Sequence, residues 1–283
     1  MSDIVRFGGI MRQIGLKTPI SYYGGKQQLS SVILSLLPPH KAYNEPFFGG
    51  GAIFFAKRPC EREYINDLNG AMINFYRVLK HNFVELKEMI DETLYSEQTH
   101  HEAKRLYNEG CDDKVRWAWS VFVLSHMSMF AIIGNTWAFS GNSNVAKKWQ
   151  RCKEWFSEVY AQRLENTHIF CRDAVAQIKR VDRDDVLHFC DPPYIDTNCG
   201  HYKGYSREDY VSLLEELSRI KGKFLLSSFP NDILSDYAAR FGWRQIEIEM
   251  HKSAGFIQGA HKVEVLTYNY DAECDRQSCL FDY

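Results

Sequence analysis

The fold is decided by residues 42–67, which read AYNEPFFGGGAIFFAKRPCEREYIND. A short strand at 42–45 leads into three glycines at 49–51, and a helix over about 52–57 precedes a second strand at 63–66. Glycine adopts backbone conformations that other residues avoid, so this turn lets a ligand approach the main chain closely. A strand, a glycine turn, a helix and a strand in this order predict the first half of a doubly wound α/β sheet.

The alternation of strands and helices continues outward from this segment, with one interruption. From about Leu86 to Gln162 the strand signals fade, and helical and loop patterns rich in Trp, His, Asn and Lys replace them. We therefore predict an α/β sheet that ends in an antiparallel β-hairpin and is interrupted by a mainly helical insertion. The remaining predicted elements are helices at 27–37, 71–79 and 233–240, a helix that opens at Ser206 with Asp209 in a capping box, and strands at 169–171, 186–190, 224–228, 244–250 and 263–270.

The composition limits the classes of function. Of the 283 residues, 45% are hydrophobic and 25% charged, which excludes disorder and collagen-like repeats. With 34 Lys and Arg against 36 Asp and Glu, the formal charge of −2 excludes a histone-like coat of positive charge, although a local basic face is compatible with DNA binding. Residues 1–17 lack the features of a secretory signal, and the apolar stretch 117–133 is shorter than the ~20 residues of a membrane helix. We predict a soluble protein of the cytoplasm without membrane association.

The cysteines indicate neither disulfides nor a metal site. A chain of this length buries roughly three quarters of its unfolded surface and needs no covalent cross-links. The eight cysteines are therefore predicted to be reduced thiols. No CxxC pair occurs, and Cys199 with His201 lacks the four regularly spaced ligands of a zinc site, so we predict no bound metal.

An acidic residue accompanies the glycine turn. Asp67 lies 22 positions after Glu45 (67 − 45) at the end of the second predicted strand, where a carboxylate usually binds ribose hydroxyls. A GxGxxG fingerprint is absent, and no helix N-terminus is evident for a pyrophosphate. These features favour a nucleoside cofactor without phosphates, and S-adenosylmethionine is the leading candidate. Asp67 also has a structural alternative, as a cap for the helix that starts near Asn69.

The tetrapeptide Asp191-Pro192-Pro193-Tyr194 follows the apolar strand at 186–190, so it lies at the carboxyl edge of the predicted sheet. Two prolines fix the backbone and remove two amide donors, which leaves carbonyl oxygens free to accept hydrogen bonds. With the carboxylate of Asp191 and the aromatic face of Tyr194, the loop suits a planar ring that bears an amino group, such as adenine. The structural alternative is a Pro-Pro loop capped by the aspartate.

Direct methyl transfer fits this loop. The lone pair of adenine's exocyclic amine is delocalised into the ring, so the amine is a poor nucleophile. Hydrogen bonds from its N–H groups to the Asp191 carboxylate and the Pro192 carbonyl would localise that lone pair. The remaining requirement is alignment of nitrogen, methyl group and sulfonium, which is catalysis by proximity and needs no metal.

These motifs, in this order, resemble the Dam-type family of S-adenosylmethionine-dependent, adenine-specific DNA methyltransferases, over about residues 18–270. Residues 21–26 (SYYGGK), 45–51 (EPFFGGG) and 191–194 (DPPY) are similar to the family's cofactor-binding and catalytic motifs, and residues 262–264 (KVE) to its terminal hairpin. Without the family, DPPY leaves the acceptor open among adenine, cytosine and protein glutamine amides. The order of the motifs favours adenine in DNA.

The resemblance also implies a division of the chain and a set of site residues. It implies a Rossmann-like class I methyltransferase domain at 18–85 and 163–271, a helical target-recognition insertion at 86–162 and a tail at 272–283. The implied catalytic residues are Asp191, Pro192, Pro193 and Tyr194, and the implied cofactor-binding residues are Tyr22, Lys26, Glu45, Phe47, Gly49, Gly51, Asp67, Asp173 and Asp191.

Double-stranded DNA is the expected partner, and the insertion is expected to read it after the target adenine has been flipped out of the helix. Asn and Ser side chains read base edges, Lys side chains meet phosphates, and Trp137 or Phe139 is placed to wedge into the base stack. The alternative is a solvated loop followed by an ordinary amphipathic helix; a second candidate region is the loop at 251–262. The predicted DNA-binding residues are Asn135, Trp137, Asn142, Asn144, Lys147 and Lys148, with Arg151 and Lys153 extending the basic run.

Further partners and other functions stay open at this point. Residues 277–281 (QSCLF) are similar to peptides that bacterial proteins insert into sliding clamps, although docking of this tail on its own domain is an equal alternative. A cognate restriction enzyme that acts on the same site is another expected partner. The competing functions are a non-catalytic DNA-binding derivative of the fold and a methyltransferase that acts on RNA or protein.

Overall fold

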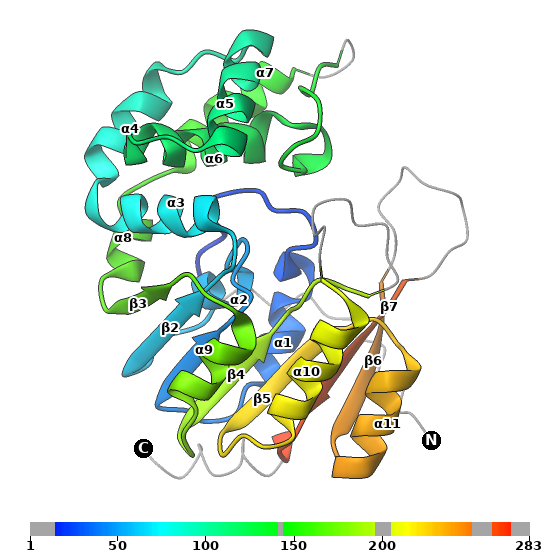
Figure 1. Ribbon diagram of the computed structural model, residues 1–283. Coiled ribbons are helices and arrows are strands. Elements are labelled where there is room, and N and C mark those ends of the chain that lie inside the picture. The colour runs from blue at the N-terminus through cyan, green and yellow to red at the C-terminus, as the bar shows by residue number, and fades with distance from the viewer. Residues whose placement is uncertain (1–14, 141–143, 196–204, 251–261, 273–283) are drawn as a thin grey trace.

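The computed structural model describes residues 15–140, 144–195, 205–250 and 262–272. Within these residues one sheet of 7 strands has the order β3-β2-β1-β4-β5-β7-β6 (Figure 1). β1 to β5 are parallel, and β7 is antiparallel to both β5 and β6. The strands are β1 (Ala42–Glu45), β2 (Arg62–Asn66), β3 (Thr167–Phe170), β4 (Val186–Cys190), β5 (Lys223–Ser228), β6 (Arg244–Met250) and β7 (Lys262–Tyr268). The predicted Rossmann-like sheet with a terminal antiparallel hairpin is confirmed.

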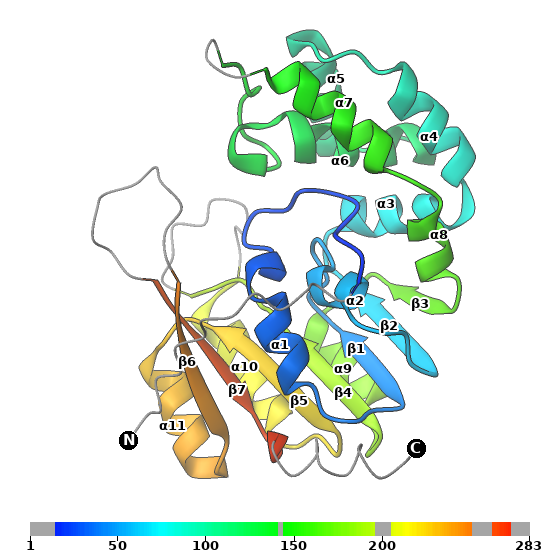
Figure 2. The same cartoon turned by 180° about the vertical axis from the view of Figure 1, so that it is seen from behind.

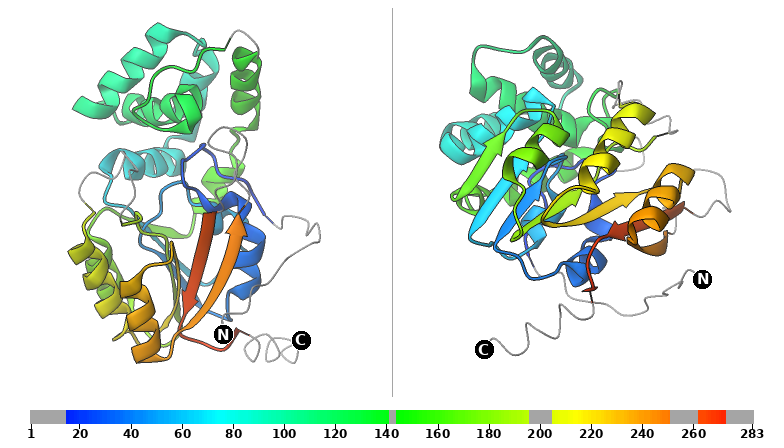
Figure 3. Two further views of the ribbon diagram at one scale, coloured as in Figure 1. Left: turned by 90° about the vertical axis from the view of Figure 1, so that its right-hand side faces the viewer. Right: turned by 60° about the horizontal axis from the view of Figure 1, so that its bottom comes forward.

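Helices cover both faces of this sheet. α9, α10 and α11 lie in front of it in Figure 1, and α1 and α2 lie on the opposite face, which Figure 2 brings forward. The left view of Figure 3 shows the sheet between the two layers. The helices are α1 (Ser30–Leu36), α2 (Ala52–Ala56), α3 (Gly70–His81), α4 (Phe83–Glu92), α5 (Glu97–Glu109), α6 (Lys114–Met127), α7 (Val145–Trp155), α8 (Val159–Leu164), α9 (Ala174–Val181), α10 (Arg207–Leu217) and α11 (Asp232–Phe241), with 3-10 turns η1 (Lys26–Gln28) and η2 (Met129–Ala131).

The central strands explain why the pattern of the sequence predicted this sheet. Every residue of β1 and of β4 is buried, because helices cover both sides of a parallel sheet. β1 lies between β2 and β4, so the chain leaves β1 toward one side and later returns on the other. Ligands of open α/β sheets bind at the carboxyl ends of the strands where this reversal occurs. The glycine turn after β1 and the loop after β4 both lie there.

The insertion forms its own helical layer. α4, α5, α6 and α7 lie together beyond the carboxyl edge of the sheet, with α3 and α8 between them and the strands (Figures 1 and 3). α6 contains most of the apolar stretch and buries residues 118–125 and Met127 in this layer. Within the described part of the chain, no helix is long and apolar enough to cross a membrane. α4 begins at Phe83 and α8 ends at Leu164, so the helical segment extends slightly beyond the predicted limits of 86 and 162.

Several local expectations are refined by the structure. The predicted helix at 27–37 is a 3-10 turn and a helix that meet at Leu29, and α9 was not predicted. Ser206 is the N-cap of α10 and forms the predicted capping box, in which the Asp209 side chain accepts the Ser206 amide. The cysteines in the described part of the chain, Cys60, Cys111, Cys152, Cys171 and Cys190, are free thiols.

Candidate active site

The amino-terminal motif places one lysine in the interior. Residues 22–25 form a turn in which the Gly25 amide donates to the Tyr22 carbonyl at 3.1 Å, and the next residue opens η1. The side chain of Lys26 is only 7% exposed. Its Nζ donates to Asp191 Oδ1 at 2.6 Å and lies 3.6 Å from Glu264 Oε1. The structure therefore joins the first predicted motif to the predicted catalytic loop, 165 positions away.

The glycine turn has no space for side chains. Gly49 and Gly51 have φ angles of 46° and 68°, in the left-handed region that favours glycine. A Cβ on Gly49 would lie 2.9 Å from the ring of Tyr22, and one on Gly51 would lie 2.5 Å from the ring of Phe48. The turn is thus a close-fitting main-chain loop at the edge of the sheet, and Tyr22 packs against it.

Asp67 ties this turn to the second strand. Its Oδ2 accepts the Gly49 amide at 2.8 Å, and its Oδ1 accepts the Asn69 amide at 2.9 Å. The N-cap of α3 is Asn69, whose side chain accepts from two amides of the first turn, so the alternative role of Asp67 as the helix cap is wrong. Burial raises the pKa of the Asp67 carboxyl, and the backbone hydrogen bonds oppose that rise.

Asn66 is a site residue that sequence reasoning missed. Its side chain donates to the carbonyls of Pro46 and Arg172 and accepts the Arg172 amide, which connects the loops after β1, β2 and β3. The sequence signal that could have identified it is an asparagine at the last position of a strand, directly before Asp67. Asp173 follows on the third loop, where its exposed side chain caps α9 through the Ala176 amide.

Glu45 ends β1 as a buried carboxylate. Its Oε2 accepts the hydroxyl of Tyr43 at 2.8 Å. Burial raises its pKa from 4.5 to about 8, and the nearby charge of Asp191 adds to this rise. Among the described residues, no lysine, arginine or histidine forms an ion pair with Glu45. A buried carboxylate without a counter-charge is an electrostatic cost unless a positively charged group binds beside it.

Asp191 and Tyr194 lie in a hydrogen-bonded cluster with β7. The hydroxyl of Tyr194 donates to Glu264 Oε1 and lies 3.3 Å from Asp191 Oδ1. Ser227 of β5 donates to the same Glu264 oxygen at 2.7 Å. Burial raises the pKa of Asp191, and Lys26 offsets only part of that rise. The expected aromatic face of Tyr194 is present, and the structure adds an anchored hydroxyl.

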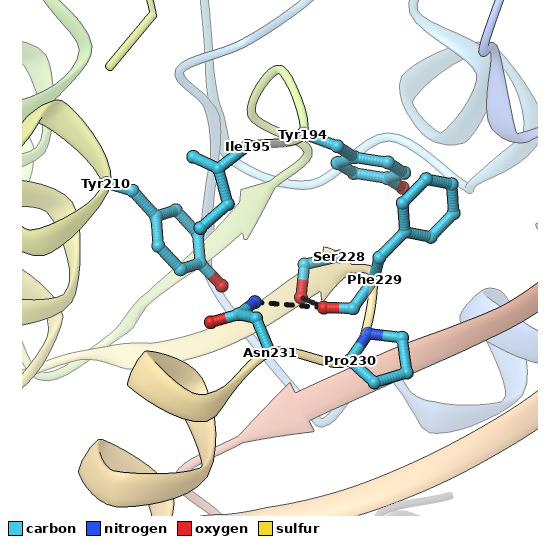
Figure 4. Close-up of a pocket in the computed structure, with 7 residues that line it drawn as sticks. All are labelled: Tyr194, Ile195, Tyr210, Ser228, Phe229, Pro230 and Asn231. Atoms are coloured by element: carbon cyan, nitrogen blue, oxygen red, sulfur yellow. Dashed lines mark hydrogen bonds between the residues drawn. The ribbon is translucent and has the colours of Figure 1, made fainter. Parts of the chain in front are cut away.

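A cavity of about 190 Å³ opens beside this loop. Figure 4 shows the rings of Tyr194 and Phe229 next to each other at one end and Tyr210 at the other. The two rings meet edge to face with centroids 4.3 Å apart. The chain carried no sequence motif that pointed to Phe229. The lining residues are Tyr194, Ile195, Tyr210, Ser228, Phe229, Pro230 and Asn231.

Phe47, another predicted cofactor-binding residue, lies beside the glycine turn. It packs, half-buried, with its ring edge-on to Tyr205 at a centroid distance of 6.0 Å. Tyr205 precedes α10, so Phe47 connects the glycine turn to the start of that helix. Pro192 and Pro193 lie at the end of β4, the first buried and the second half-buried.

The predicted DNA-contacting residues have different surroundings. Lys147 and Lys148 are exposed on the first turns of α7, and Asn144 caps this helix by accepting the Lys147 amide at 2.8 Å. Asn135 donates to the Met129 carbonyl, and Trp137 packs half-buried on Tyr95. Phe139 is 72% exposed. Asn142 lies outside the described residues.

Lys153 was predicted to extend the basic run toward DNA, and the structure instead places it against the main chain. Its ammonium donates to the carbonyls of Asp91 and Thr93 at the end of α4. It therefore holds α7 on α4, because a cation is favourable at a helix C-terminus. Arg151, by contrast, is exposed.

Other predictions fall on residues that the structure does not describe. These are the Cys199 and His201 pair, the loop at 251–261 and the tail peptide at 277–281. Within the described ranges, no group of three or more His, Cys, Asp or Glu side chains is arranged to hold a metal ion.

Comparisons with known proteins show similarity to adenine-specific DNA methyltransferases. A family model described as D12 class N6 adenine-specific DNA methyltransferase matches residues 22–248. The type II methyltransferase M1.LlaDCHI of Lactococcus lactis subsp. cremoris is 27% identical over 278 residues, covering 91% of this chain and 97% of that protein. A DNA N-6-adenine-methyltransferase of Escherichia phage P1 is 26% identical over 72% of this chain and 29% of its own length. The DNA adenine methylase of Salmonella typhi is 25% identical over 62% of this chain and 64% of that protein.

The family match spans both halves of the sheet and the insertion between them. It includes the amino-terminal motif, the glycine turn and the Asp191–Tyr194 loop, which the structure brings to one edge. The chain belongs to the D12 class N6 adenine-specific DNA methyltransferase family.

Proposed function

We propose that this protein transfers a methyl group from S-adenosylmethionine to the exocyclic 6-amino group of an adenine flipped out of double-stranded DNA. Family membership supports methylation of adenine in DNA. The observation that supports the mechanism most directly is the contact between Lys26 and Asp191, because it holds the catalytic loop beside the cofactor-binding motifs.

The residues at the sheet edge fit this methyl donor. S-adenosylmethionine has a positively charged sulfonium and ammonium, and it supplies an electrophilic methyl group when bound. The buried Glu45 carboxylate forms no ion pair with a described residue, and the attraction of Lys57 leaves its pKa raised, so it would bind the ammonium. Asp67 would accept hydrogen bonds from ribose hydroxyls, and the turn at Gly49 and Gly51 would admit the ligand to the main chain. Tyr22, Lys26, Phe47 and Asp173 would complete the cofactor site.

Asp191 and Pro192 would orient the acceptor. Lys26 occupies one carboxylate oxygen of Asp191, and the other makes no hydrogen bond with any described residue. This second oxygen and the Pro192 carbonyl would accept the two amine hydrogens, which localises the nitrogen lone pair toward the donor. Pro193 stiffens the loop, and Tyr194 with Phe229 would flank the base at the mouth of the cavity. Flipping the base costs a few kcal/mol, which DNA contacts must offset.

The helical insertion would provide those contacts. Lys147 and Lys148 are exposed side by side and would bind phosphates. Asn135, Asn142 and Asn144 would lie near base edges. Trp137 is already packed in the insertion, so the more exposed Phe139 is the better wedge. Replacing both lysines by alanine should weaken binding to all DNA sequences and reduce the salt dependence of the affinity.

The decisive experiment offers the protein three acceptors with methyl-labelled S-adenosylmethionine. Label should appear in double-stranded DNA as N6-methyladenine and not in RNA or protein. Transfer to protein or RNA alone would overturn the proposed acceptor. The absence of transfer together with firm DNA binding would instead favour a non-catalytic derivative. Sequencing of modified adenines in a host that expresses the chain would define the recognition site.

Two partners and a location complete the proposal. The tail at 277–281 would bind a sliding clamp, and a restriction enzyme would share the methylated site. Because its substrate is DNA, the enzyme would act in the cytoplasm. Deletion of residues 276–283 should abolish capture by an immobilised clamp, and a full-length chain that is not captured would end the clamp proposal.

A further inference from the structure

Glu264 is a buried carboxylate at the catalytic loop to which the proposed mechanism gives no role. It lies on β7 and is 1% exposed. Its Oε1 accepts the Tyr194 hydroxyl and the Ser227 hydroxyl, and it lies 3.6 Å from Lys26 Nζ. Such a group is retained in an interior only if its hydrogen bonds and counter-charge offset the cost of desolvation. Two hydroxyl donors and one nearby ammonium satisfy that condition here.

The contact with Tyr194 determines where its single hydroxyl proton points. That hydroxyl also lies 3.3 Å from Asp191 Oδ1 and would turn toward Asp191 if Glu264 were absent. Asp191 would then accept from both Lys26 and Tyr194. A carboxylate with more donors is a weaker acceptor, so it would bind the target amine less strongly. The loop would also lose the anchor that connects Tyr194 to β7.

Glu264 also changes the charge of the site. One lysine serves two carboxylates, with Nζ–O distances of 2.6 Å to Asp191 and 3.6 Å to Glu264. The second anion leaves a net negative charge, which favours the positive charge that develops on the amine nitrogen during transfer. The ionisable groups that face Asp191 are Lys26 from η1, Glu45 from β1, Cys190 from β4, Tyr194 from the loop and Glu264 from β7.

We propose that Glu264 is a positioning residue for methyl transfer, which directs the Tyr194 hydroxyl away from Asp191 and shares Lys26 with it. Asp191 thereby keeps one close donor on Oδ1, and its other oxygen stays a strong acceptor for the target amine. This inference rests on the proposed function, since it assigns Glu264 a role in the same reaction.

The test compares Glu264→Ala and Glu264→Gln with the wild-type protein in single-turnover methylation of DNA. Glu264→Ala should lower the rate by roughly 100-fold, as expected for a misplaced reacting group, while the affinity for S-adenosylmethionine changes little. Glu264→Gln keeps an acceptor for Tyr194 and Ser227, so it should restore most of the rate. Glu249→Gln, an exposed glutamate on β6, is the matched control and should behave as wild type.

Two readouts separate positioning from a purely structural role. The charge of Glu264 raises the pKa of Asp191, so the acidic limb of the pH–rate profile should move to lower pH in Glu264→Gln. Tyr194→Phe should restore part of the rate in the Glu264→Ala background, because it removes the hydroxyl that would otherwise turn toward Asp191. Circular dichroism and the unfolding midpoint of each variant establish that the measured protein is folded.

The outcomes are distinct. Rescue by Glu264→Gln, the shifted acidic limb and a non-additive double mutant support the inference. If wild-type protein methylates DNA and folded Glu264→Ala does so at the same rate, the inference is wrong while the proposed function stands. If wild-type protein transfers no methyl group to DNA at any pH, the proposed function fails and the inference fails with it.

Discussion

Two buried clusters of charged side chains have opposite balances. Beside the loop at 191–194, Lys26 lies between two carboxylates, Asp191 and Glu264. Between β2 and α8, the single carboxylate of Glu63 is bound by two cations, with Lys57 Nζ at 2.6 Å and Arg163 in a two-pronged contact. The first cluster has an excess of negative charge, and the second has an excess of positive charge.

The pKa values of the carboxyl groups reflect this difference. Burial raises the pKa of Glu63, but the hydrogen bonds and charges of Arg163 and Lys57 outweigh it and leave the pKa below its ordinary value. Burial raises the pKa of Asp191, and there Lys26 does not compensate fully. The cluster of Glu63, Lys57 and Arg163, called the paired cluster below, therefore stabilises the fold, and it fastens α8 of the insertion to the sheet. The cluster of Lys26, Asp191 and Glu264, called the anion-rich cluster below, is suited to a positively charged ligand and to an amine that gains positive charge.

The largest expected effect is in the anion-rich cluster. Asp191→Asn should lower the rate of methyl transfer by at least about 1,000-fold, because it removes the charged acceptor of the target amine. Binding of S-adenosylmethionine and the unfolding midpoint should change little. Single-turnover kinetics and calorimetry measure the two quantities. An active, folded Asp191→Asn protein would remove the catalytic assignment.

The paired cluster should show the reverse behaviour. Glu63→Gln leaves Lys57 and Arg163 buried without a counter-charge, so the free energy of unfolding should fall by about 3 kcal/mol. The protein that remains folded should methylate DNA at close to the wild-type rate. Urea unfolding monitored by circular dichroism, with the rate normalised to folded protein, tests this contrast. A large loss of rate without loss of stability would contradict it.

The buried carboxylate of Glu45 should make the stability of the protein depend on pH. Its pKa of about 8 in the folded protein exceeds the ordinary 4.5, so the folded state binds the proton more tightly. Stability without a ligand should therefore fall as the pH rises from about 4.5 to 8. Glu45→Gln should show less of this fall and be the more stable protein at pH 8, yet bind S-adenosylmethionine roughly tenfold more weakly. Equal pH dependence in the two proteins would argue against the buried charge.

The smallest effect is expected for an exposed ion pair. Arg105 and Glu109 are one helical turn apart on α5, with an N–O distance of 3.0 Å and both side chains more than half exposed. Water and salt screen such a pair, so Glu109→Gln should change the free energy of unfolding by less than about 0.5 kcal/mol. A change as large as that of Glu63→Gln would mean that burial is not what distinguishes the clusters.

The sheet and one edge of the site could be predicted from the sequence. Residues 186–190 (VLHFC) are a short and mostly apolar run, and residues 42–45 (AYNE) directly precede the turn that contains the three glycines; both segments are fully buried central strands. The carboxyl ends of parallel strands meet at one edge, so Glu45, Asp67 and Asp191 were expected to be neighbours. This inference uses only periodicity and turn residues, which are local properties of the chain.

The contacts that complete the site could not be predicted in this way. Glu264 was visible only as part of the last hairpin, and Asn66 and Phe229 carried no motif. Their roles depend on the order of strands in the sheet, since β7 pairs with β5 and thereby brings Glu264 to Tyr194 and Lys26. Local preferences of the sequence determined which segments are strands and where their polar ends lie. Long-range packing decided which buried charges became partners, because hydrogen bonds and desolvation depend on neighbours that are far apart along the chain.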